Sequence, residues 1–503
     1  MVSKYFLTCD IGTSVTKTVL YDKNFKAVAS ASEENVSTHT KSCWIEQDPK
    51  QWWATIIREI GKVTEDIDPT DIVGVATCAQ MHAPILVDLE GNPLFPCLSW
   101  PDRRTVQLVE EVSRETGVPQ PYFTSTAPKI LWIKRQDPKI LEKTYKVLLP
   151  KDFIRMKLSN TFCTDTTDAP GTAMYDLEKK TWNWKVVDYI GLDHDKLPRV
   201  YPSEQVVGGI TEKIAKETGL NAGIPVIAGT ADFGIGRTVE QSVLRPGNLL
   251  IYLGTGPGIW WISSEESLSR RSRSKLCILG VAGTMPQWFK NTFCYEESLH
   301  AKEQGINTFQ LLNSKAEKVE PGSDGLIVLP HLMGERAYGG RTIADERRLN
   351  PLARGVFFGL CMGHTRAHVF RAILEGVTYH LRLCWEQIQA ANPGSTSNLI
   401  VTTGGGAKSQ LWRQIIADTF NLPVYRLKEL ETSTLGLACL IAVGTGMYKD
   451  MQEAIAKVDN PKIEGIQPNP NNFARYTEMF ELYKQLERDL ERFFRHPTGL
   501  RES

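Results

Sequence analysis

The sequence has no excess of charge of either sign. Its 503 residues contain 58 lysines and arginines and 58 aspartates and glutamates, which leaves a formal net charge of zero. A nucleic-acid-binding protein usually carries a basic patch or stripe, and neither such a stripe nor an acidic tail stands out. Composition therefore gives no support for a polyanion-binding protein, and any anion that the protein handles must be bound by local geometry.

Long hydrophobic runs and paired cysteines are also missing. No stretch reaches the roughly 18 apolar residues of a transmembrane helix, and the N-terminus lacks the successive basic and apolar regions of a signal peptide. Ten cysteines are scattered without a C-x-x-C pair, which in a large chain indicates a reducing compartment rather than a disulfide framework. We therefore expect a soluble cytoplasmic protein that does not act at a membrane.

Two common nucleotide-binding motifs do not occur. The chain has no G-x-x-x-x-G-K-[ST] loop, so it is not a P-loop enzyme. None of its glycine turns opens a βαβ unit with G-x-G-x-x-G, which disfavours a dinucleotide-binding fold.

What the chain does contain is an alternation of short β-branched runs with amphipathic helical stretches, the pattern of an α/β protein. Strands are predicted at residues 71–79, 224–229, 248–254, 324–330 and 398–406. Long helices are predicted at residues 49–63, 364–388, 409–420 and 471–496.

A weak internal repeat links two hairpins. Residues 5–22, YFLTCDIGTSVTKTVLYD, and residues 248–263, NLLIYLGTGPGIWWIS, both indicate an apolar strand, a glycine–threonine turn and a second apolar strand. They lie about one domain length apart, as expected if a hairpin-led α/β unit was duplicated. The boundary between the two copies is predicted near residues 242–248.

Polar residues gather in the turn of the first hairpin, between arms that we predict to be buried. A turn that contains Gly12 and Thr13 offers backbone N–H groups to a phosphate. The hydroxyls of Thr13 and Ser14 are further donors, and Lys17 adds a positive charge. Asp10, at the end of the first strand, is placed to hold Mg²⁺ directly or through water, since this ion prefers few carboxylates and several waters.

Two further turns have the same chemistry. Gly254 and Thr255 lie in the turn of the second hairpin, which could bind the same phosphates from the other side. The segment TTGGGAKSQ, residues 402–410, runs from a strand through three glycines into a helix, whose N-terminus suits a nucleotide. Its candidate nucleotide-binding residues are Gly404, Gly405, Gly406 and Ser409. Any one such turn is a weak signal, but three together, two of them in matching hairpins, favour a phosphate-binding protein.

Eleven segments in order along nearly the whole chain resemble the FGGY carbohydrate kinases, and most of all the xylulose kinase-like branch of that family. The segments are DIGTSVTKTVLYD (10–22), WIEQDPKQWW (44–53), AQMH (79–82), LSWPDRRT (98–105), TAPKILWIKRQDP (126–138), LLPKDFIRMKLSN (148–160), TDTTDAPGTAMYD (164–176), GIPVIAGTADFGIG (223–236), LPHLMGER (329–336), LARGVFFGL (352–360) and TTGGGAKSQLWRQIIADTFNLPV (402–424).

This resemblance implies an α/β fold of two ribonuclease-H-like (actin-like) domains that face each other across a catalytic cleft. The N-terminal domain, residues 1–245, would bind the sugar. The C-terminal domain, residues 246–503, would bind most of the ATP and end in a helix and a short tail. The hairpin repeat, which was found without the resemblance, agrees with such a duplicated fold.

Asp232, in GTADFGIG, is the candidate catalytic base. It follows a predicted buried strand as a helix begins, which exposes it at the carboxyl end of that strand, where α/β sites usually lie. It also matches the catalytic base of the family. A carboxylate there is ionised at neutral pH and can accept the proton of a sugar hydroxyl. The structural alternative for this position is a helix N-cap.

Sugar contacts are expected from the first domain. Gln80, Met81 and His82 follow a predicted strand, and Met81 and His82 coincide with a sugar-contacting pair of the family. Trp100 could lie against the apolar face of a sugar, and the carboxylate of Asp102 could accept two hydroxyls. The alternatives are a structural histidine, a core tryptophan and an exposed turn acid.

Three positions depart from the pattern of xylulose kinases and put the substrate in doubt. Ala83 replaces a common glycine, and Pro101 and Phe233 stand where asparagines are often found. A pocket that loses such polar contacts accepts a different pattern of hydroxyls. The basic stretch SRRSRSKLCILG, residues 269–280, is interpreted as a solvated loop.

The leading hypothesis is therefore an ATP-dependent, Mg²⁺-requiring kinase that phosphorylates a primary hydroxyl of a ketopentose such as D-xylulose by direct in-line transfer. The alternative within the class is a kinase for another ketose, a polyol, an aldonic acid such as gluconate, or an autoinducer-type substrate. From a different class, a sugar-sensing or actin-like nucleotide-gated protein remains open. The expected partners are the sugar and ATP, with no nucleic acid and no membrane, and a homodimer is compatible with the sequence.

Overall fold

The structure is a computed structural model that describes residues 4–41, 44–118, 125–241, 243–264, 276–278, 282–334, 353–459 and 461–494. Most of the basic stretch at 269–280 lies outside these residues. The chain packs as two compact units. Unit 1 consists of Met1–Ser242 and Glu431–Asp459, and unit 2 consists of Val243–Leu430 and Asn460–Ser503.

The sheet of unit 1 has the strand order β13-β14-β5-β1-β2-β3, with β15 paired to β5. The first three strands form an antiparallel meander, and β1 then pairs in parallel with β5. The strands of this sheet are β1 (Tyr5–Ile11), β2 (Val15–Asp22), β3 (Ala27–Glu34), β5 (Ile72–Ala79), β13 (Val206–Gly209), β14 (Pro225–Ile227) and β15 (Thr230–Ala231). Short strand pairs are formed by β4 (Glu46–Gln47) with β7 (Cys97–Leu98), β6 (Ile85–Val87) with β8 (Lys146–Leu148), β9 (Cys163–Asp165) with β12 (Arg199–Tyr201), and β10 (Tyr175–Asp176) with β11 (Thr181–Trp182).

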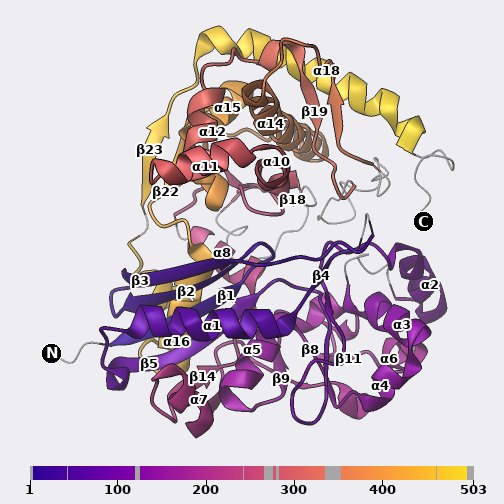
Figure 1. The fold of residues 1–503 in the computed structure, drawn as a ribbon, viewed down its shortest axis with the longest axis vertical. Coiled ribbons are helices and arrows are strands. Elements are labelled where there is room, and N and C mark those ends of the chain that lie inside the picture. The colour runs from indigo at the N-terminus through magenta and orange to yellow at the C-terminus, as the bar shows by residue number, and fades with distance from the viewer. Residues whose placement is uncertain are drawn as a thin grey trace. The chain divides into compact units, whose positions relative to one another are not determined.

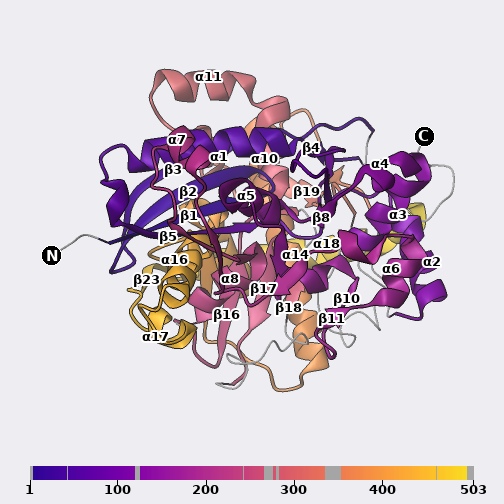
Figure 2. The same ribbon diagram turned by 90° about the horizontal axis from the view of Figure 1, so that it is seen from below.

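Helices cover both faces of this sheet because β1 alternates its side chains between two cores. Leu7, Cys9 and Ile11 pack with α1 (Pro49–Thr64). Phe6, on the opposite face, packs with α16 (Thr432–Gly444). Figures 1 and 2 show α1 and α16 on opposite sides of the β1–β2–β3 meander. The period of two along a strand places Asp10 on the face that carries α16.

The remaining helices of unit 1 complete these cores and form a third one. They are α2 (Val106–Thr116), α3 (Thr126–Gln136), α4 (Pro138–Lys143), α5 (Pro150–Ser159), α6 (Trp184–Ile190), α7 (Glu212–Thr218), α8 (Asp232–Gln241) and α17 (Met451–Ile455). The third core lies between α2, α3 and α6.

The sheet of unit 2 has the strand order β18-β17-β16-β21-β22-β23. Its strands are β16 (Asn248–Tyr252), β17 (Gly258–Trp261), β18 (Leu276–Ile278), β21 (Leu399–Thr403), β22 (Val424–Leu427) and β23 (Lys462–Ile466), with β19 (Ile327–Leu329) and β20 (Val356–Phe358) in a separate pair. Its helices are α10 (Met285–Phe293), α11 (Tyr295–Glu303), α12 (Thr308–Ala316), α14 (Arg366–Ala391), α15 (Gln410–Phe420) and α18 (Pro470–Phe494). In Figure 1, α18, coloured yellow, runs along α14 and β19.

The two sheets correspond strand for strand, which confirms the repeat predicted from the hairpins. In each, three antiparallel strands lead to two further parallel strands and end on an antiparallel one. β1 and β2 correspond to β16 and β17, so the turn at Gly12–Ser14 and the turn at residues 253–257 occupy equivalent places. The predicted long helices are also confirmed as α1, α14, α15 and α18.

The units differ from the predicted domains in one segment. Residues 431–459 pack with unit 1, because α16 is buried over most of its length against β5 and α8. Two glycines allow α16 to approach α8 and β5 closely. An added Cβ on Gly436 would lie 2.6 Å from the Ile235 side chain, and one on Gly74 would lie 2.8 Å from that of Ile441.

Two further observations concern the expectations from composition. Among the helices of the described ranges, none is long and apolar enough to cross a membrane. Among the cysteines of the described ranges, seven are free thiols and Cys384 is disulfide-bonded, which was not expected from the sequence.

The tight approach of β14–β15 to β5 leads to a stability prediction. Gly229 has a φ of +81°, and an added Cβ would overlap the carbonyl oxygen of Thr77. Gly219 has a similar φ of +77° but an added Cβ there has no heavy atom within 4 Å. We expect Gly219→Ala to cost about 1–2 kcal/mol for its left-handed backbone and Gly229→Ala roughly 3 kcal/mol or more, because overpacking adds to that cost. Thermal unfolding of both variants would contradict this if the two melted together.

Candidate active site

The first hairpin turn directs its carbonyl oxygens into the protein. The carbonyl of Gly12 accepts from Asn35 Nδ2 at 2.7 Å, and that of Ser14 accepts from the Asn35 backbone N–H at 2.8 Å. Gln47 Nε2 donates to the carbonyl of Thr13 at 2.8 Å. Carbonyl oxygens repel an anion, so their engagement by Asn35 and Gln47 suits the turn to bind a phosphate.

Trp100 contacts this same turn. Its indole Nε1 donates to Thr13 Oγ1 at 2.6 Å. An indole N–H can only donate, so the hydroxyl of Thr13 acts as acceptor toward Trp100 and its own hydrogen is directed elsewhere. A residue predicted to contact the sugar therefore positions a residue predicted to contact the phosphate.

Gln80 connects the turn to the strand ends behind it. Only 1% of its surface is exposed. Its Nε2 donates to Gln47 Oε1 at 2.7 Å, and its Oε1 accepts from Ser99 Oγ at 2.8 Å. The described geometry favours a supporting role for Gln80, through Gln47, over the predicted direct contact with a sugar.

Asp102 is likewise committed to protein partners. Its carboxylate is fully buried and accepts from the backbone N–H of Ile45 at 2.6 Å and from Arg104 Nη2 at 2.8 Å. Arg104 pairs also with Glu46 at 2.8 Å and lies over the ring of Trp44 at 3.9 Å from its centroid. Direct contact of Asp102 with a sugar stays a prediction that this geometry does not favour.

His82 is held in an uncommon backbone conformation beside Met81. Its φ is +71°, and strain of this kind clusters at functional sites. The Nδ1 atom lies 2.7 Å from the carbonyl oxygen of Gly171, which can only accept, so Nδ1 carries the hydrogen and Nε2 is the acceptor in the neutral ring. Gly171 packs closely on this pair, because an added Cβ would lie 2.9 Å from the His82 ring and 3.2 Å from Met81 Cε.

Asp10, Gln80 and Asp232 lie at one edge of the sheet, where β1, β5 and β15 end. Asp10 and Thr230 both stand opposite Cys78 of β5, so two strand spacings, about 10 Å, separate them. Asp232 follows Thr230 by two residues and begins α8. Burial, and then the charges of Asp10 and Asp232, raise the pKa of the Cys78 thiol well above its usual value.

The carboxyl group of Asp10 lies in an unfavourable place for a lone negative charge. Its Oδ1 is buried and has no hydrogen-bond partner in the described part of the chain. Burial raises the pKa of Asp10 to about 6, although Cys78 and Lys17 act in the opposite direction. Lys17, which stands opposite Asp10 on β2, is paired with Glu431 in this structure. A divalent cation would supply the missing partner, so Asp10 fits the predicted Mg²⁺ ligand.

A cluster of buried charged side chains is connected to the backbone next to Asp232. Lys151 Nζ is 2.5 Å from Asp152 Oδ1, 3.0 Å from Asp165 Oδ1 and 3.5 Å from Asp168 Oδ2. Arg155 pairs with Asp152 at 3.0 Å, and all five side chains are fully buried. Burial holds the pKa of Asp168 above its ordinary value in spite of Lys151. A proton on Asp168 would leave two cations facing two carboxylates.

This cluster fixes the residues next to the candidate base. Asp165 Oδ2 accepts from Thr167 Oγ1 at 2.6 Å. Thr167 Oγ1 in turn accepts from the backbone N–H of Ala231 at 3.0 Å and lies 2.9 Å from Thr230 Oγ1. The backbone that carries Asp232 is therefore held by hydrogen bonds that lead back to Lys151.

The same cluster also supports His82. Asp168 precedes a short 3₁₀ turn, Ala169–Thr172, and its carbonyl accepts from the N–H of Gly171 at 2.9 Å. Gly171 is the residue whose carbonyl oxygen holds the His82 ring. Lys151 therefore stabilises the segments that position both the candidate base and a candidate sugar contact.

Sequence reasoning did not assign a role to this cluster. Its members lie in PKDFIR, residues 150–155, and TDTTDA, residues 164–169, both of which contributed only to the family resemblance. Charged and apolar residues alternate along α5, so hydrophobic periodicity alone did not indicate that the charged ones are buried.

In unit 2 the second hairpin turn and the glycine loop lie side by side. The N–H of Leu253 donates to Thr403 O, and the N–H of Gly406 donates to Leu253 O, both at 2.9 Å. Gly404 has a φ of +81°, and an added Cβ would lie 3.0 Å from Tyr252 Cε2. An added Cβ on Gly406 would lie 2.8 Å from Leu253 Cβ, so Gly404 and Gly406 are required by the close contact of the two turns.

Two residues of this loop have different surroundings. Ser409 caps α15, where its hydroxyl accepts from the N–H of Trp412 at 3.1 Å and donates to Asn313 Oδ1 at 2.8 Å. This geometry favours a structural role for its side chain. An added Cβ on Gly405 would meet no heavy atom within 4 Å, so the loop leaves space there for a ligand. Gly254 and Thr255 are partly exposed in the adjoining turn.

Comparison with known proteins places nearly the whole chain among carbohydrate kinases. Residues 5–237 match the model of the N-terminal domain of the FGGY family of carbohydrate kinases, and residues 279–445 match that of its C-terminal domain. A xylulose kinase of Bacillus subtilis (strain 168) is 30% identical over 96% of this chain and 96% of its own length. A gluconokinase of the same organism is 28% identical over 91% of this chain and 89% of its own length. The crystal structure of a gluconate kinase from Lactobacillus acidophilus aligns with a TM-score of 0.74 at 26% identity, over 97% of this chain and 98% of that chain.

Removing the central lysine of the buried cluster should destabilise unit 1. Lys151→Met leaves three buried carboxylates facing only Arg155, and breaking a buried ion pair in this way costs about 3–5 kcal/mol. The loss should be larger at alkaline than at acidic pH, because protonation relieves the unpaired aspartates. Lys139→Met, which removes an exposed lysine, is the control. Thermal unfolding of the two variants at the same temperature would contradict the role of Lys151.

The raised pKa of Asp10 predicts a pH-dependent gain in stability when its charge is removed. Between the ordinary value of 3.8 and the folded value of about 6, the folded protein binds a proton that the unfolded chain releases. The stabilisation from this proton is therefore lost as the pH rises through 6. Asp10→Asn should melt above the wild type by a margin that is small at about pH 4, is roughly half developed at about pH 5 and levels off above about pH 7.

The exposed Asp66 provides a matched variant, Asp66→Asn, for the loss of a surface charge. A margin for Asp10→Asn that shrinks with rising pH, or that follows the Asp66→Asn margin, would show that Asp10 titrates without a raised pKa.

Proposed function

Because the chain belongs to the FGGY family of carbohydrate kinases, we propose that it transfers the γ-phosphate of ATP to a primary hydroxyl of a small ketose, with a ketopentose such as D-xylulose as the first candidate. The family membership makes it an ATP-dependent carbohydrate phosphotransferase. The observation that carries the proposal is the position of Asp232, at the carboxyl end of β15, on backbone held by Thr167.

Asp232 would act as the general base. A phosphoryl group passes through a loose transition state, so catalysis is mostly positioning and stabilisation of charge. The sugar hydroxyl loses its proton to the Asp232 carboxylate as its oxygen attacks the γ-phosphorus. The N-terminus of α8, whose first residue is Asp232, favours the ionised carboxylate that this step requires.

The turns would bind the nucleotide's phosphates. Thr13, which accepts from Trp100, has its hydroxyl hydrogen available for a phosphate oxygen, and Ser14 follows it in the same turn. Lys17 is paired with Glu431 here, and in the proposal it adds positive charge near the phosphates. In unit 2 the turn with Gly254 and Thr255 and the loop from Gly404 to Gly406 would hold ATP.

Asp10 would hold Mg²⁺, which supplies charge neutralisation for the phosphates when it is bound. The buried Oδ1 of Asp10 and its raised pKa support this assignment. A proton and the cation compete for the same carboxylate, so the demand for Mg²⁺ should rise in acid.

Met81, His82 and Trp100 would contact the sugar. Met81 and Trp100 are partly exposed, and the His82 ring lies against Gly171 beside Met81. Gln80 and Asp102 would support these contacts indirectly, through their hydrogen bonds to Gln47 and Arg104.

A kinase for an aldonic acid is the second candidate. It is favoured by similarity to the gluconokinase of Bacillus subtilis and to the gluconate kinase structure. Ala83 and Pro101 lie next to the candidate sugar contacts and replace residues common in xylulose kinases, so the hydroxyl pattern cannot be transferred from those relatives.

A substrate panel with MgATP tests the function. D-xylulose, other ketopentoses, polyols and gluconate are each added, and ADP release is measured. Sugar-dependent release that is greatest for a ketopentose supports the first candidate, and greatest release with gluconate supports the second. ADP release that is independent of every sugar would contradict the proposal.

Asp232→Asn tests the mechanism. It keeps the shape of the side chain but removes the base, so kcat should fall roughly 10²–10⁴-fold, the usual contribution of acid–base catalysis, with little change in ATP affinity. Asp137→Asn, at an N-cap of α4 in the same unit, controls for a purely structural role of a first-turn aspartate. Retention of more than about a tenth of kcat in Asp232→Asn would remove the assignment.

A further inference from the structure

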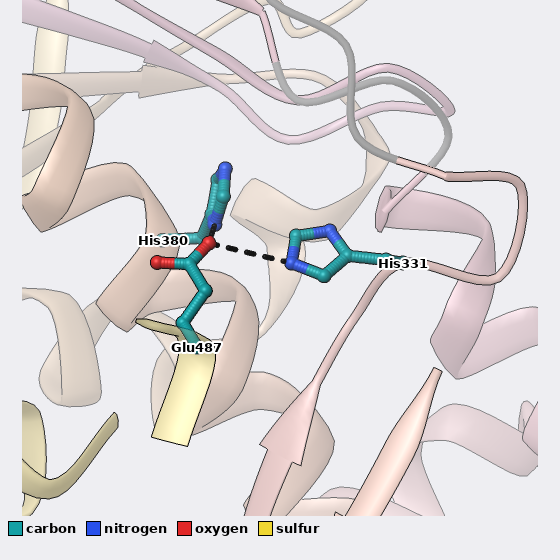
Figure 3. Close-up of side chains that lie close together, drawn as sticks. All are labelled: His331, His380 and Glu487. Atoms are coloured by element: carbon teal, nitrogen blue, oxygen red, sulfur yellow. Dashed lines mark ion pairs between the residues drawn. The ribbon is translucent and has the colours of Figure 1, made fainter. Parts of the chain in front are cut away.

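Four buried side chains converge inside unit 2. His331 follows β19, His380 lies in the middle of α14, and Tyr483 and Glu487 are one turn apart on α18. Their exposed fractions are 5%, 4%, 0% and 8%, respectively. Figure 3 shows the two imidazole rings directed toward the carboxylate of Glu487. Three separate elements therefore present nitrogen and oxygen atoms to one point.

Glu487 lies farther from both imidazole rings than a hydrogen bond reaches. Glu487 Oε1 lies 3.6 Å from His331 Nε2 and 3.5 Å from His380 Nδ1, whereas N–H···O bonds have N···O distances of about 2.7–3.2 Å. The ligand atoms of the three residues all lie within 4.8 Å of one another. Ligands bound at about 2.0–2.1 Å to a tetrahedral zinc ion stand about 3.3 Å apart. The distances from Glu487 Oε1 to the two imidazole nitrogens are thus close to the spacing of ligands around one ion.

His331 supplies an independent observation. Its Nε2 is buried and has no hydrogen-bond partner among the described residues. Leaving a buried polar atom unpaired costs about 1–3 kcal/mol, and a metal bond to this nitrogen would remove that cost. The His331 and His380 rings meet nearly edge to face, at 79° with centroids 4.9 Å apart, so the nitrogens can point inward without stacking of the rings.

Tyr483 completes the group. Its hydroxyl is hydrogen-bonded to His380 Nδ1 at 2.9 Å, so it lies beside one of the candidate ligand atoms. The i, i+4 relation of Tyr483 and Glu487 puts both on one face of α18. Two imidazoles, a carboxylate and a phenol form a donor set of borderline character, which suits zinc better than calcium or magnesium.

We propose that His331, His380 and Glu487, with Tyr483 in the fourth position, form a structural zinc site. Binding releases the protons that these groups carry to solvent, because the ligands must be deprotonated. Four protein ligands close the coordination shell, which is typical of structural rather than catalytic sites. The ion would tie α18, the last described helix, to α14 and to the segment after β19.

Metal analysis of the full-length protein, with any affinity tag removed, tests the site. After purification and reloading with Zn²⁺, the wild type should contain about one zinc per chain that survives gel filtration. His331→Ala and Glu487→Gln should each lower the zinc content at least about tenfold, because loss of one of four ligands breaks a closed shell. His300→Ala, which removes a largely exposed imidazole outside the cluster, should keep the full content.

Two measurements on the wild type test the site even if a variant fails to fold. Co²⁺ added to the chelator-stripped wild type should produce the visible absorption of a tetrahedral ion, and added Zn²⁺ should displace it. Thermal unfolding of the stripped protein should shift upward when Zn²⁺ is added, since the ion binds only the folded site.

Two results would overturn the proposal. One is a wild type that takes up no zinc beyond the His331→Ala and Glu487→Gln variants and shows no tetrahedral cobalt spectrum. The other is zinc that is bound equally by all variants, which would place it elsewhere in the chain. Either result would leave the cluster as a buried group of ionisable side chains without a metal.

Discussion

Lys151 and its three aspartates are the interaction on which the candidate site depends. A lysine without solvent contact is tolerated only beside compensating charge, and Asp152, Asp165 and Asp168 supply that charge from three adjoining segments. From there, hydrogen bonds through Thr167 reach the backbone before Asp232. Bonds through Gly171 reach His82. The buried charge of Lys151 thus supports both the candidate base and a candidate sugar contact.

The duplicated sheet explains where the other polar residues lie. Each copy ends its first hairpin in a glycine-containing turn, and each places parallel strands beside that hairpin. In unit 1 the carbonyl oxygens of the turn are held by Asn35 and Gln47. In unit 2 the turn is joined to the glycine loop by backbone hydrogen bonds. The same local sequence pattern is thus stabilised by side chains in one copy and by the main chain in the other.

Two residues of the family motifs that were predicted to contact the sugar are bound to protein partners. Asp102 binds Arg104 and the N–H of Ile45, and Gln80 binds Gln47 and Ser99. Such residues are as sensitive to substitution as a ligand-binding residue, because a buried polar group that loses its partner is costly. Asp10 is the opposite case. Its Oδ1 has no hydrogen-bond partner among the described residues and its pKa is raised, so a bound cation would supply the partner that the protein lacks.

The sequence alone determined the α/β class, the hairpin repeat, the polar turns and the position of Asp232, because strand periodicity and turn glycines are local properties. It could not determine partners that are distant along the chain. Lys151 with Asp165, Trp100 with Thr13, His331 with Glu487 and the packing of residues 431–459 in unit 1 were decided only by the tertiary structure. Burial and pairing depend on which elements pack together, and no short stretch of sequence contains that information.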